Sequence, residues 1–391
     1  MGPDYHQPEE NAPSAFIAAP VPTKASATES EFANWWQSLH DDQLNALVER
    51  AVSANPDVLI ALTRLQQART YETVLVGHAL PQVNATGGAG RGTGSDLTRG
   101  RAEQGLVSAD NAAGLRHLNL IGGFDATWEL DVFGRVRREI EAAHYDAQAV
   151  AAARNGVLTA VISDVVRAYV ELRGLQTQAA LLRKAQSALS ESQRIVRIRY
   201  ERGITNELDL TLATRELASV ESQIAPVEAQ AAAAQYAIAA LLGAYPESLA
   251  EELSAPGLIP EFPEPAPAGT PLDVLRRRPD VQQAERELAR ATAQVGIATG
   301  NLFPRVALVG AIGAQSQGWG TSPSKGQHIW SFGPGVIWPL LDFGALDAQV
   351  EIAGLGARRA AQLSPDGHPG GSGRRHVARL VPRPASKAAK P

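Results

Sequence analysis

The stretch WELDVFG, residues 128–134, marks a change of periodicity along the chain. On its N-terminal side, from Leu118 to Leu130, every second residue is apolar or small and the residues between are mostly polar. That alternation predicts a strand with one apolar face. On its C-terminal side, from Arg135 to Arg202, there is no proline, only two glycines, and mostly strong helix formers. A helix of that length would span about 100 Å, so the strand runs into a helix far longer than an ordinary domain needs.

Composition narrows the class of protein. The chain has 391 residues, a net charge of −5 and no cysteine. The missing cysteine excludes disulfides, thiol catalysis and cysteine metal sites, and the negative charge argues against a nucleic-acid partner. No run of 18 apolar residues predicts a membrane-spanning helix, but transmembrane β-strands are short and leave only a weak hydropathy signal. The opening MGPDYHQPEE lacks the basic and apolar regions of a signal peptide, so we expect either a cytosolic protein or a true start further upstream.

The chain contains an internal repeat. NPDV (55–58) aligns with RPDV (278–281) at an offset of 223, and WELDVFG aligns with WPLLDFG (338–344) after a shorter loop. Each half therefore reads helix, strand, loop, strand and then long helix. At the offset of 223 the identical residues of the first half include Pro56, Asp57, Val58, Ala61, Leu65, Ala68, Pro81, Val83, Gly87 and Gly90.

A seven-residue apolar repeat follows the first long helix. Its two rows are Leu210, Leu217, Ile224, Ala231 and Ile238, and Ala213, Val220, Val227, Ala234 and Leu241. This heptad pattern favours supercoiled helix packing, and Pro226 within it is expected to kink the helix. In the intervening RYERGITNELDL, Gly203 can end one helix in the left-handed conformation, and Thr205 or Asn206 can cap the next. The pattern predicts an antiparallel helix hairpin with its tip near 202–206.

These signals divide the chain into an arm, two repeats, a linker and a tail. We expect an extended arm over 1–34 and a first repeat over 35–244, with strands at 82–92 and 118–131 and a helix hairpin at 135–243. A proline-rich linker over 245–271 follows. We then expect a second repeat over 272–356, with strands at 304–314 and 329–341, and a disordered basic tail over 357–391.

Four strands are too few to close a barrel, and a membrane does not tolerate lipid-exposed sheet edges. If the strands span a bilayer, several chains must share one barrel, and two or three chains would give the even strand numbers of bacterial barrels. The alternation alone leaves open which face meets lipid, and Trp128 and Trp338 fit either a core or an interfacial aromatic belt. The residues expected in the membrane strands and at the interface are Leu118, Leu120, Phe124, Trp128, Val306, Leu308, Trp330 and Trp338.

Several motifs in order, namely WELDVFG, LRRRPDVQQAE, FPRVALVGAIG and RYERGITNELDL, resemble the outer-membrane factors of Gram-negative tripartite (RND-type) efflux systems. The sequence is most similar to the NodT/OprM lipoprotein branch of the TolC-like channels, over roughly residues 2–355. The resemblance implies an α+β membrane protein: a homotrimer whose shared twelve-stranded barrel lies in outer-membrane lipid and continues as a periplasmic α-helical barrel.

The same resemblance implies a function and partners. It implies passive exit of drugs, dyes and other small solutes, driven by an inner-membrane RND pump that is joined through a periplasmic adaptor protein. The tip residues that it implies for the adaptor contact are Arg202, Gly203, Ile204 and Thr205.

Two features depart from the family pattern. GPDYHQP (2–8) resembles the mature start of that branch, which normally follows a lipidated, palmitate-bearing cysteine, but here that cysteine and a signal peptide are missing. The segment 357–391 has five prolines, four glycines and eight Lys or Arg against one Asp, where the family continues with a second long helix pair. We therefore expect a frameshifted or truncated copy. The alternatives are a non-functional fragment of such a channel, or a soluble periplasmic coiled-coil interaction protein.

Motifs for enzymatic chemistry are weak. The glycine cluster GGAGRGTG (87–94) does not fit G-x-G-x-x-G and has no Walker lysine. The eight histidines show no metal-binding spacing, and no Ser/His/Asp set or carboxylate pair is supported. We therefore expect no catalytic residue, no cofactor, no metal site and no enzymatic activity.

Overall fold

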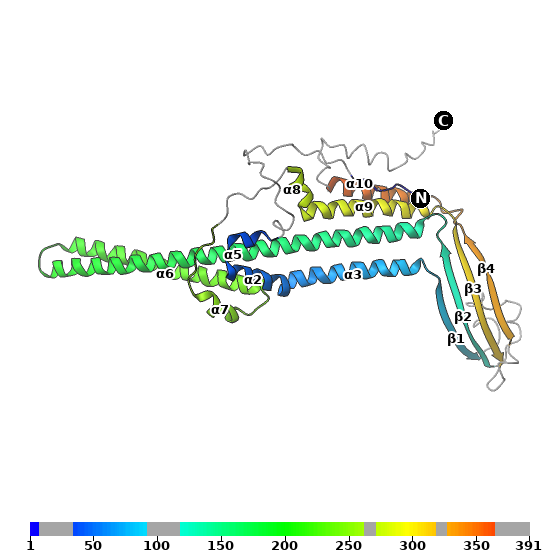
Figure 1. The fold of residues 1–391 in the computed structure, drawn as a ribbon, viewed down its shortest axis with the longest axis horizontal. Helices are drawn as coiled ribbons and strands as arrows, with labels where there is room; N and C mark the ends of the chain where they lie inside the picture. Colours follow the sequence, from blue (N-terminus) through cyan, green and yellow to red (C-terminus); the bar gives the residue numbers. More distant parts are fainter. Residues whose placement is uncertain (8–33, 92–117, 262–270, 318–326, 364–391) are drawn as a thin grey trace, which may run out of the picture. The chain divides into compact units, whose positions relative to one another are not determined.

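The computed structural model describes residues 1–7, 34–91, 118–261, 271–317 and 327–363 (Figure 1). Contacts divide the chain into two compact units, unit 1 with residues 1–11, 65–151 and 281–391, and unit 2 with residues 12–64 and 152–280. The elements in chain order are η1 (Trp35–Leu39), α2 (Asp42–Ala54), α3 (Pro56–His78), β1 (Gln82–Arg91), β2 (Leu118–Leu130), α5 (Arg135–Glu201), α6 (Glu207–Leu241), α7 (Pro246–Ser254), α8 (Pro271–Arg277), α9 (Pro279–Gly300), β3 (Arg305–Gln317), β4 (Gln327–Ile337) and α10 (Ala345–Leu363).

Unit 1 contains one four-stranded antiparallel sheet in the order β1-β2-β3-β4. One transverse row of its register runs from Ala85 to Phe124, then to Ile312 and Trp330. The two hairpins have the same register, because Gln82 faces Thr127 in the first and Arg305 faces Ile337 in the second. Strands β2 and β3, which belong to different repeats, form the seam between the hairpins.

The internal repeat is present in the structure. α3 and β1 begin at Pro56 and Gln82, and α9 and β3 begin 223 residues later. Trp128 donates its indole N–H to the carbonyl of Ala79 (2.9 Å), and Trp338 donates to the equivalent carbonyl of Leu302 (3.1 Å). The glycines that close the two motifs also match, since Gly134 and Gly344 have φ of +80° and +84°.

The fourth strand is shorter at its C-terminal end than expected. The sequence predicted a strand over 329–341, but β4 ends at Ile337, so Trp338 lies just beyond the strand rather than within it. Ile337 pairs with Arg305, the first residue of β3, so β3 offers no further ladder partner beyond Ile337. Trp338 is instead held through its indole hydrogen bond.

Two helices correct the expected segment plan. The predicted linker over 245–271 contains α7, which starts with a proline at its first position and buries Leu249 and Leu253. The predicted disordered tail over 357–391 begins inside α10, which continues to Leu363 and buries Ala357. The segment after residue 356 still contains strong helix formers and no proline before Pro365, which accounts for the longer helix. Residues 8–33 of the predicted arm and 364–391 of the predicted tail lie outside the described residues.

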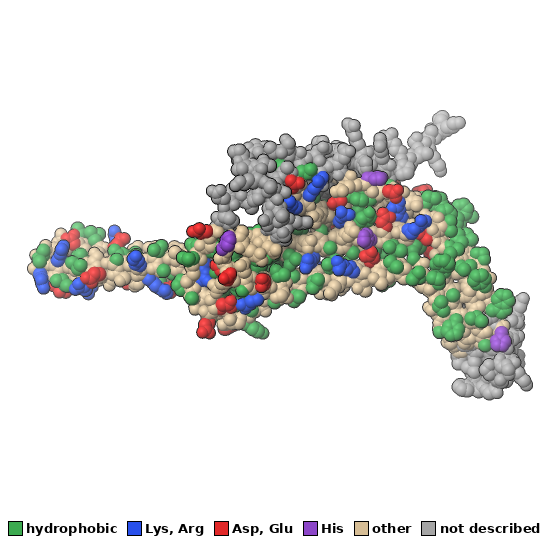
Figure 2. Space-filling view, in the orientation of Figure 1, with side chains coloured by type: hydrophobic (Ala, Val, Ile, Leu, Met, Phe, Trp, Pro, Cys, Tyr) green, Lys and Arg blue, Asp and Glu red, His purple; other side chains and the backbone are tan. Residues whose placement is uncertain are grey.

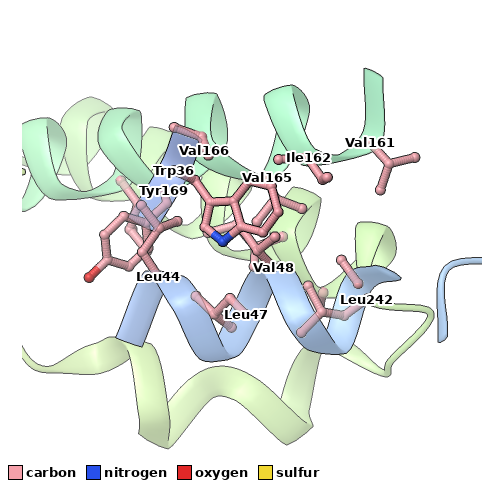
Figure 3. Close-up of a cluster of buried hydrophobic side chains, with 14 of the residues drawn as sticks. Trp36, Leu44, Leu47, Val48, Val161, Ile162, Val165, Val166, Tyr169 and Leu242 are labelled. Atoms are coloured by element: carbon pink, nitrogen blue, oxygen red, sulfur yellow. The ribbon is translucent and has the colours of Figure 1, made fainter. Parts of the chain in front are cut away.

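Unit 2 has its own hydrophobic core (Figure 3). α2 contributes Leu44, Leu47 and Val48, which are fully buried, and α5 contributes Val165 and Tyr169 among others. The 67-residue helix α5 also contains an 18-residue window with mean hydropathy of 1.4, a third of which is buried, so by length and composition alone it could cross a membrane. A single window of this kind is weak evidence, because core helices of soluble proteins have the same property.

A buried arginine stabilises this core through hydrogen bonds. Arg173 donates to the carbonyl of Ala255 (2.7 Å) and to the side chain of Gln176 (2.7 Å). Tyr169 donates its hydroxyl to Asp41 (2.8 Å), whose other carboxylate oxygen accepts from the backbone N–H of Leu44 and so caps α2. Burial raises the pKa of Tyr169. The polar groups thus tie α2, α5 and the segment after α7 together.

Helices α5 and α6 form the expected antiparallel hairpin. Cross-helix contacts join Gln193 to Thr214 (3.1 Å) and Arg183 to Glu228 (2.7 Å). All ten residues of the two predicted heptad rows are buried or half-buried, whereas most other residues of α6 are exposed. The two heptad rows therefore lie on the inward side of the hairpin, as the sequence predicted. α6 continues as one helix through Pro226.

Candidate functional site

The register gives the sheet one apolar face. Residues paired across strands point to the same side, and alternate residues along each strand share a side. Phe124, Ile312 and Trp330 therefore lie on one face, and most of their area is exposed. The further members of this apolar face are Val83, Ala85, Ala126, Trp128, Leu130, Val306, Leu308, Phe332, Pro334 and Val336. Figure 2 shows hydrophobic side chains gathered on the sheet and where it joins the helices.

The opposite face is mostly polar or small, with Val309 and Ile337 among its apolar members. It carries Asn84, Asp125 and Thr127 on the first hairpin, with Ala311 and Ser331 on the second. Asn84 donates its side-chain amide to Asp125 (3.0 Å). The sheet therefore separates an apolar side from a hydrophilic side, as a strand wall between lipid and water requires.

The predicted membrane residues come together on the apolar face. Leu118, Leu120, Phe124, Trp128, Val306, Leu308 and Trp330 all share it by register. For Leu118 and Leu120 only the backbone position is described. The sequence analysis did not single out Ile312, Phe332 and Val336, although the alternation in both second-repeat strands could have found them.

Within the described ranges β1 pairs only with β2 and β4 only with β3, so each edge strand has one unpaired side there. Unpaired backbone N–H and C=O groups cannot be satisfied by lipid. An exposed apolar face between two free edges is a surface that needs both a membrane and further strands.

The turn between strand and helix is rigidly capped at WELDVFG. The Asp131 carboxylate accepts the backbone N–H groups of Val136 and Arg137, both at 3.0 Å, at the start of α5. Burial acts to raise the pKa of Asp131, but these hydrogen bonds and the one from the Arg137 side chain outweigh it and leave that pKa below its ordinary value. Arg135 forms a bidentate pair with Glu129 at the end of β2 (2.8 Å).

The hairpin tip is a tight glycine turn. Gly203 has φ of +71° with open space around it, and the N–H of Ile204 bonds to the carbonyl of Arg199 (2.8 Å). Of the two predicted caps, Asn206 caps α6 by accepting from the N–H of Asp209 (3.0 Å). Ile204 and Leu208 remain largely exposed at this tip.

Metal-binding chemistry has no candidate in the part of the chain that the structure describes, where no group of three or more His, Asp or Glu side chains is placed to hold an ion.

A two-faced strand wall with free edges, joined to long helices, defines a class of protein: a subunit of a membrane barrel that several chains share.

Comparisons with known proteins specify that class. The model of the family described as "Outer membrane efflux protein" matches residues 47–244 and 271–363. Nodulation protein T of Rhizobium leguminosarum bv. viciae is 31% identical, with 90% of this chain and 69% of that protein covered. The probable efflux pump outer membrane protein TtgC of Pseudomonas putida is 28% identical, with 90% and 71% covered. The solved outer-membrane channel OprN is similar with a TM-score of 0.78 at 32% identity, covering 97% of this chain and 80% of that one.

The chain belongs to the outer membrane efflux protein family. It is a subunit of a TolC-like efflux channel of the Gram-negative outer membrane, with its helical part in the periplasm. The predicted family and fold class are therefore confirmed. The family match ends at residue 363, beyond the residue 356 at which the sequence analysis ended the second repeat.

Proposed function

We propose that three copies of this chain form a twelve-stranded barrel through which drugs and other small solutes leave the cell passively. The observation that carries the proposal is the sheet with an exposed apolar face and two unpaired edges. Three sheets of four strands satisfy every edge by pairing with a neighbour, and they leave an even number of antiparallel strands.

In this barrel the apolar face meets lipid and the polar face lines the lumen. Trp330 and Phe332 are 77% and 72% exposed, far too much for core residues of a water-soluble sheet. Asp125 and Thr127 lie on the other face, where water solvates them. Trp128 and Trp338, near the end of the sheet from which the helices start, suit the aromatic belt at the periplasmic interface.

We assign the energy supply to an inner-membrane RND pump. A periplasmic adaptor protein links the two. The tip residues Arg202, Gly203, Ile204 and Thr205 would contact the adaptor. Support comes from the rigid turn at Gly203 and the exposed apolar side chain of Ile204. The subunit itself carries out no chemistry and binds no cofactor.

Membrane extraction and drug susceptibility together test the channel. The full chain is expressed in a Gram-negative strain that lacks its own outer-membrane efflux channel but retains an adaptor and a pump. We expect a protein that resists salt washing, needs detergent for extraction and lowers susceptibility to pump substrates. Release by salt washing would instead support a soluble coiled-coil protein and contradict the proposal.

Substitution at Gly203 tests the tip. Gly203→Val places a β-branched side chain at a positive φ, where it is strained, and adds bulk to the proposed contact. We expect drug resistance to fall while the amount of assembled protein in the outer membrane is unchanged. Gly203→Asn is the matched control, because asparagine tolerates the left-handed conformation, and it should retain most of the resistance. Full drug resistance with Gly203→Val would show that the hairpin tip does not contact the adaptor.

A further inference from the structure

The apolar face of the sheet carries a depression with a volume of about 380 Å³. Its floor is formed by Ala126 of β2 and Gly310 of β3, which lie opposite each other in the register. A Cβ added to Gly310 would lie 3.4 Å from Cδ2 of Phe332, which is an ordinary contact distance. The small size of these two residues therefore creates the space, and a larger side chain at position 310 would occupy it.

Large apolar side chains surround this floor. The next row of the register, away from the helices, places Phe124, Ile312 and Trp330 along one side of the depression. Val83 and Phe332 lie at the two ends of the row to which the floor itself belongs. The depression thus has walls on three sides, and each wall is made of an aromatic or aliphatic side chain.

The fourth side of the depression is open and points toward the helices. The row on that side contains Trp128, Leu308 and Pro334, and none of these described residues lines the depression. The floor is two residues from Trp128, about 7 Å along the strand. Membrane strands are tilted by about 35–45° and their apolar band is about 25 Å tall, so the depression lies in the half of the band that is nearer the helices.

This position selects one leaflet of the membrane. The helical part of the channel is in the periplasm, so the open side of the depression faces the periplasmic leaflet. In a Gram-negative outer membrane that leaflet consists of glycerophospholipid, whereas lipopolysaccharide occupies the outer leaflet. The floor also lies on the inner strands β2 and β3, away from the free edges of the sheet that further chains would cover.

The lining favours a hydrocarbon chain as the occupant. Three further lining residues, Asp125, Ala311 and Ser331, belong to the polar face by register, so their side chains point away from the depression. Lipid tails are as apolar as the remaining side chains, so packing rather than the hydrophobic effect decides what binds. An unfilled space deprives its walls of van der Waals contacts, and a flexible acyl chain fills such a space without needing a polar partner.

We infer that an acyl chain of a glycerophospholipid from the periplasmic leaflet occupies this depression on each subunit. The lipid enters from the open side, and its chain end packs between the floor and the side chains of Phe124, Ile312 and Trp330. The inference rests on the proposed lipid-facing orientation of the apolar face. It adds a specific lipid site to that face.

Native mass spectrometry of the detergent-purified full chain tests this site. The purified protein is first washed in fresh detergent to remove loosely associated lipid. We expect the washed oligomer to retain glycerophospholipid, up to one molecule per chain. Gly310→Leu places a side chain on the floor, next to Phe332, and should lower the retained phospholipid several-fold.

Gly122→Leu is the matched control. Gly122 lies on the same apolar face, in the row beyond Phe124 and outside the depression, and a Cβ added there meets no atom within 4 Å. This variant should retain as much phospholipid as the parent protein. Both variants should assemble as the parent does, because each new leucine faces lipid.

Photolabelling of the unsubstituted chain gives a second test that does not depend on the assembly of Gly310→Leu. A phospholipid with a diazirine in the middle of one acyl chain is exchanged into the purified oligomer, unbound lipid is washed out, and the retained lipid is irradiated. We expect cross-links at positions 124–126, 310–312 and 330–332. Labels spread evenly over the apolar face, including Val336 outside the depression, would overturn the inference.

The outcomes separate this site from the proposed function. Equal phospholipid retention by the parent protein, Gly310→Leu and Gly122→Leu in a detergent-extracted oligomer overturns the site and leaves the shared barrel standing. Retention of lipopolysaccharide in place of phospholipid overturns the choice of leaflet and therefore the inference. Release of the chain from membranes by salt washing overturns the shared barrel and the lipid site with it.

Discussion

The core of unit 2 and the sheet of unit 1 use the same apolar side chains in opposite ways. In unit 2, Leu44, Leu47 and Val48 are fully buried between α2 and α5. In unit 1, Ile312, Phe332 and their neighbours stay mostly exposed, and no second layer covers this face among the described residues. Unit 2 satisfies its apolar surface within one chain, whereas the sheet can do so only in lipid and beside further copies.

This difference assigns separate roles to the two regions. Burial of a leucine or valine stabilises a folded chain by about 1.5–3 kcal/mol relative to exposure, so the unit 2 core stabilises the chain itself. The same residues on the sheet provide no such gain until the chain is in the membrane. Damage to the two regions should therefore be seen in different measurements.

The largest effect is expected in the unit 2 core. Leu47→Ala removes a fully buried side chain and leaves a cavity, which should lower the free energy of unfolding by about 2–5 kcal/mol. Leu181→Ala is the control, because Leu181 on α5 is 63% exposed, and it should change stability by less than about 0.5 kcal/mol. Thermal loss of the helical circular dichroism signal of the detergent-purified protein measures both. Equal effects of the two variants would contradict this core assignment.

A charge introduced on the sheet should impair assembly on the apolar face but not on the polar face. Phe332→Arg places a cation on the apolar face, at a cost of about 2–4 kcal/mol near the bilayer midplane. It should abolish outer-membrane assembly, measured as detergent-extracted oligomer. Ser331→Arg is the matched control at the neighbouring position on the polar face, and it should assemble. If the two variants assemble in the reverse order, the faces are assigned the wrong way round.

A smaller, pH-dependent effect on the free energy of unfolding is expected at the strand–helix turn. The pKa of Asp131 is lowered in the folded chain, so its ionised form stabilises the fold above its unfolded pKa of about 3.9. That contribution is lost as pH falls through the lowered, folded value. Asp131→Asn should therefore be less stable than the parent at pH 7 by about 1 kcal/mol or less, and the gap should narrow in acid. A gap that stays constant down to pH 2 would show that the charge contributes nothing.

Local patterns predicted much of this fold. Alternation located the strands, and the heptads identified most of the inward-facing residues of α6 but not the buried Ala239. Both periods follow from the geometry of a single element. The repeat also predicted two equivalent hairpins. The end of β4 was misplaced because apolar residues continue past Ile337, whereas the ladder ends at the pair with Arg305, the first residue of the partner strand β3.

Features that depend on contacts between distant parts of the chain could not be predicted from the sequence. The register that aligns Phe124 with Ile312 and Trp330 joins different repeats, so no local period specifies it. Without that register the lipid-facing side stayed open. The buried Arg173 network was missed for the same reason, since Asp41 and Ala255 meet it from distant parts of the chain. α7 was missed because the prolines around it masked a short amphipathic helix.

The number of chains in the detergent-extracted particle tests the central claim most directly. Light scattering of the full-length protein, corrected for bound detergent, gives that number without any substitution. We expect three chains, and therefore twelve strands with every edge paired. A stable monomer, with its four strands and two free edges intact in detergent, would contradict it.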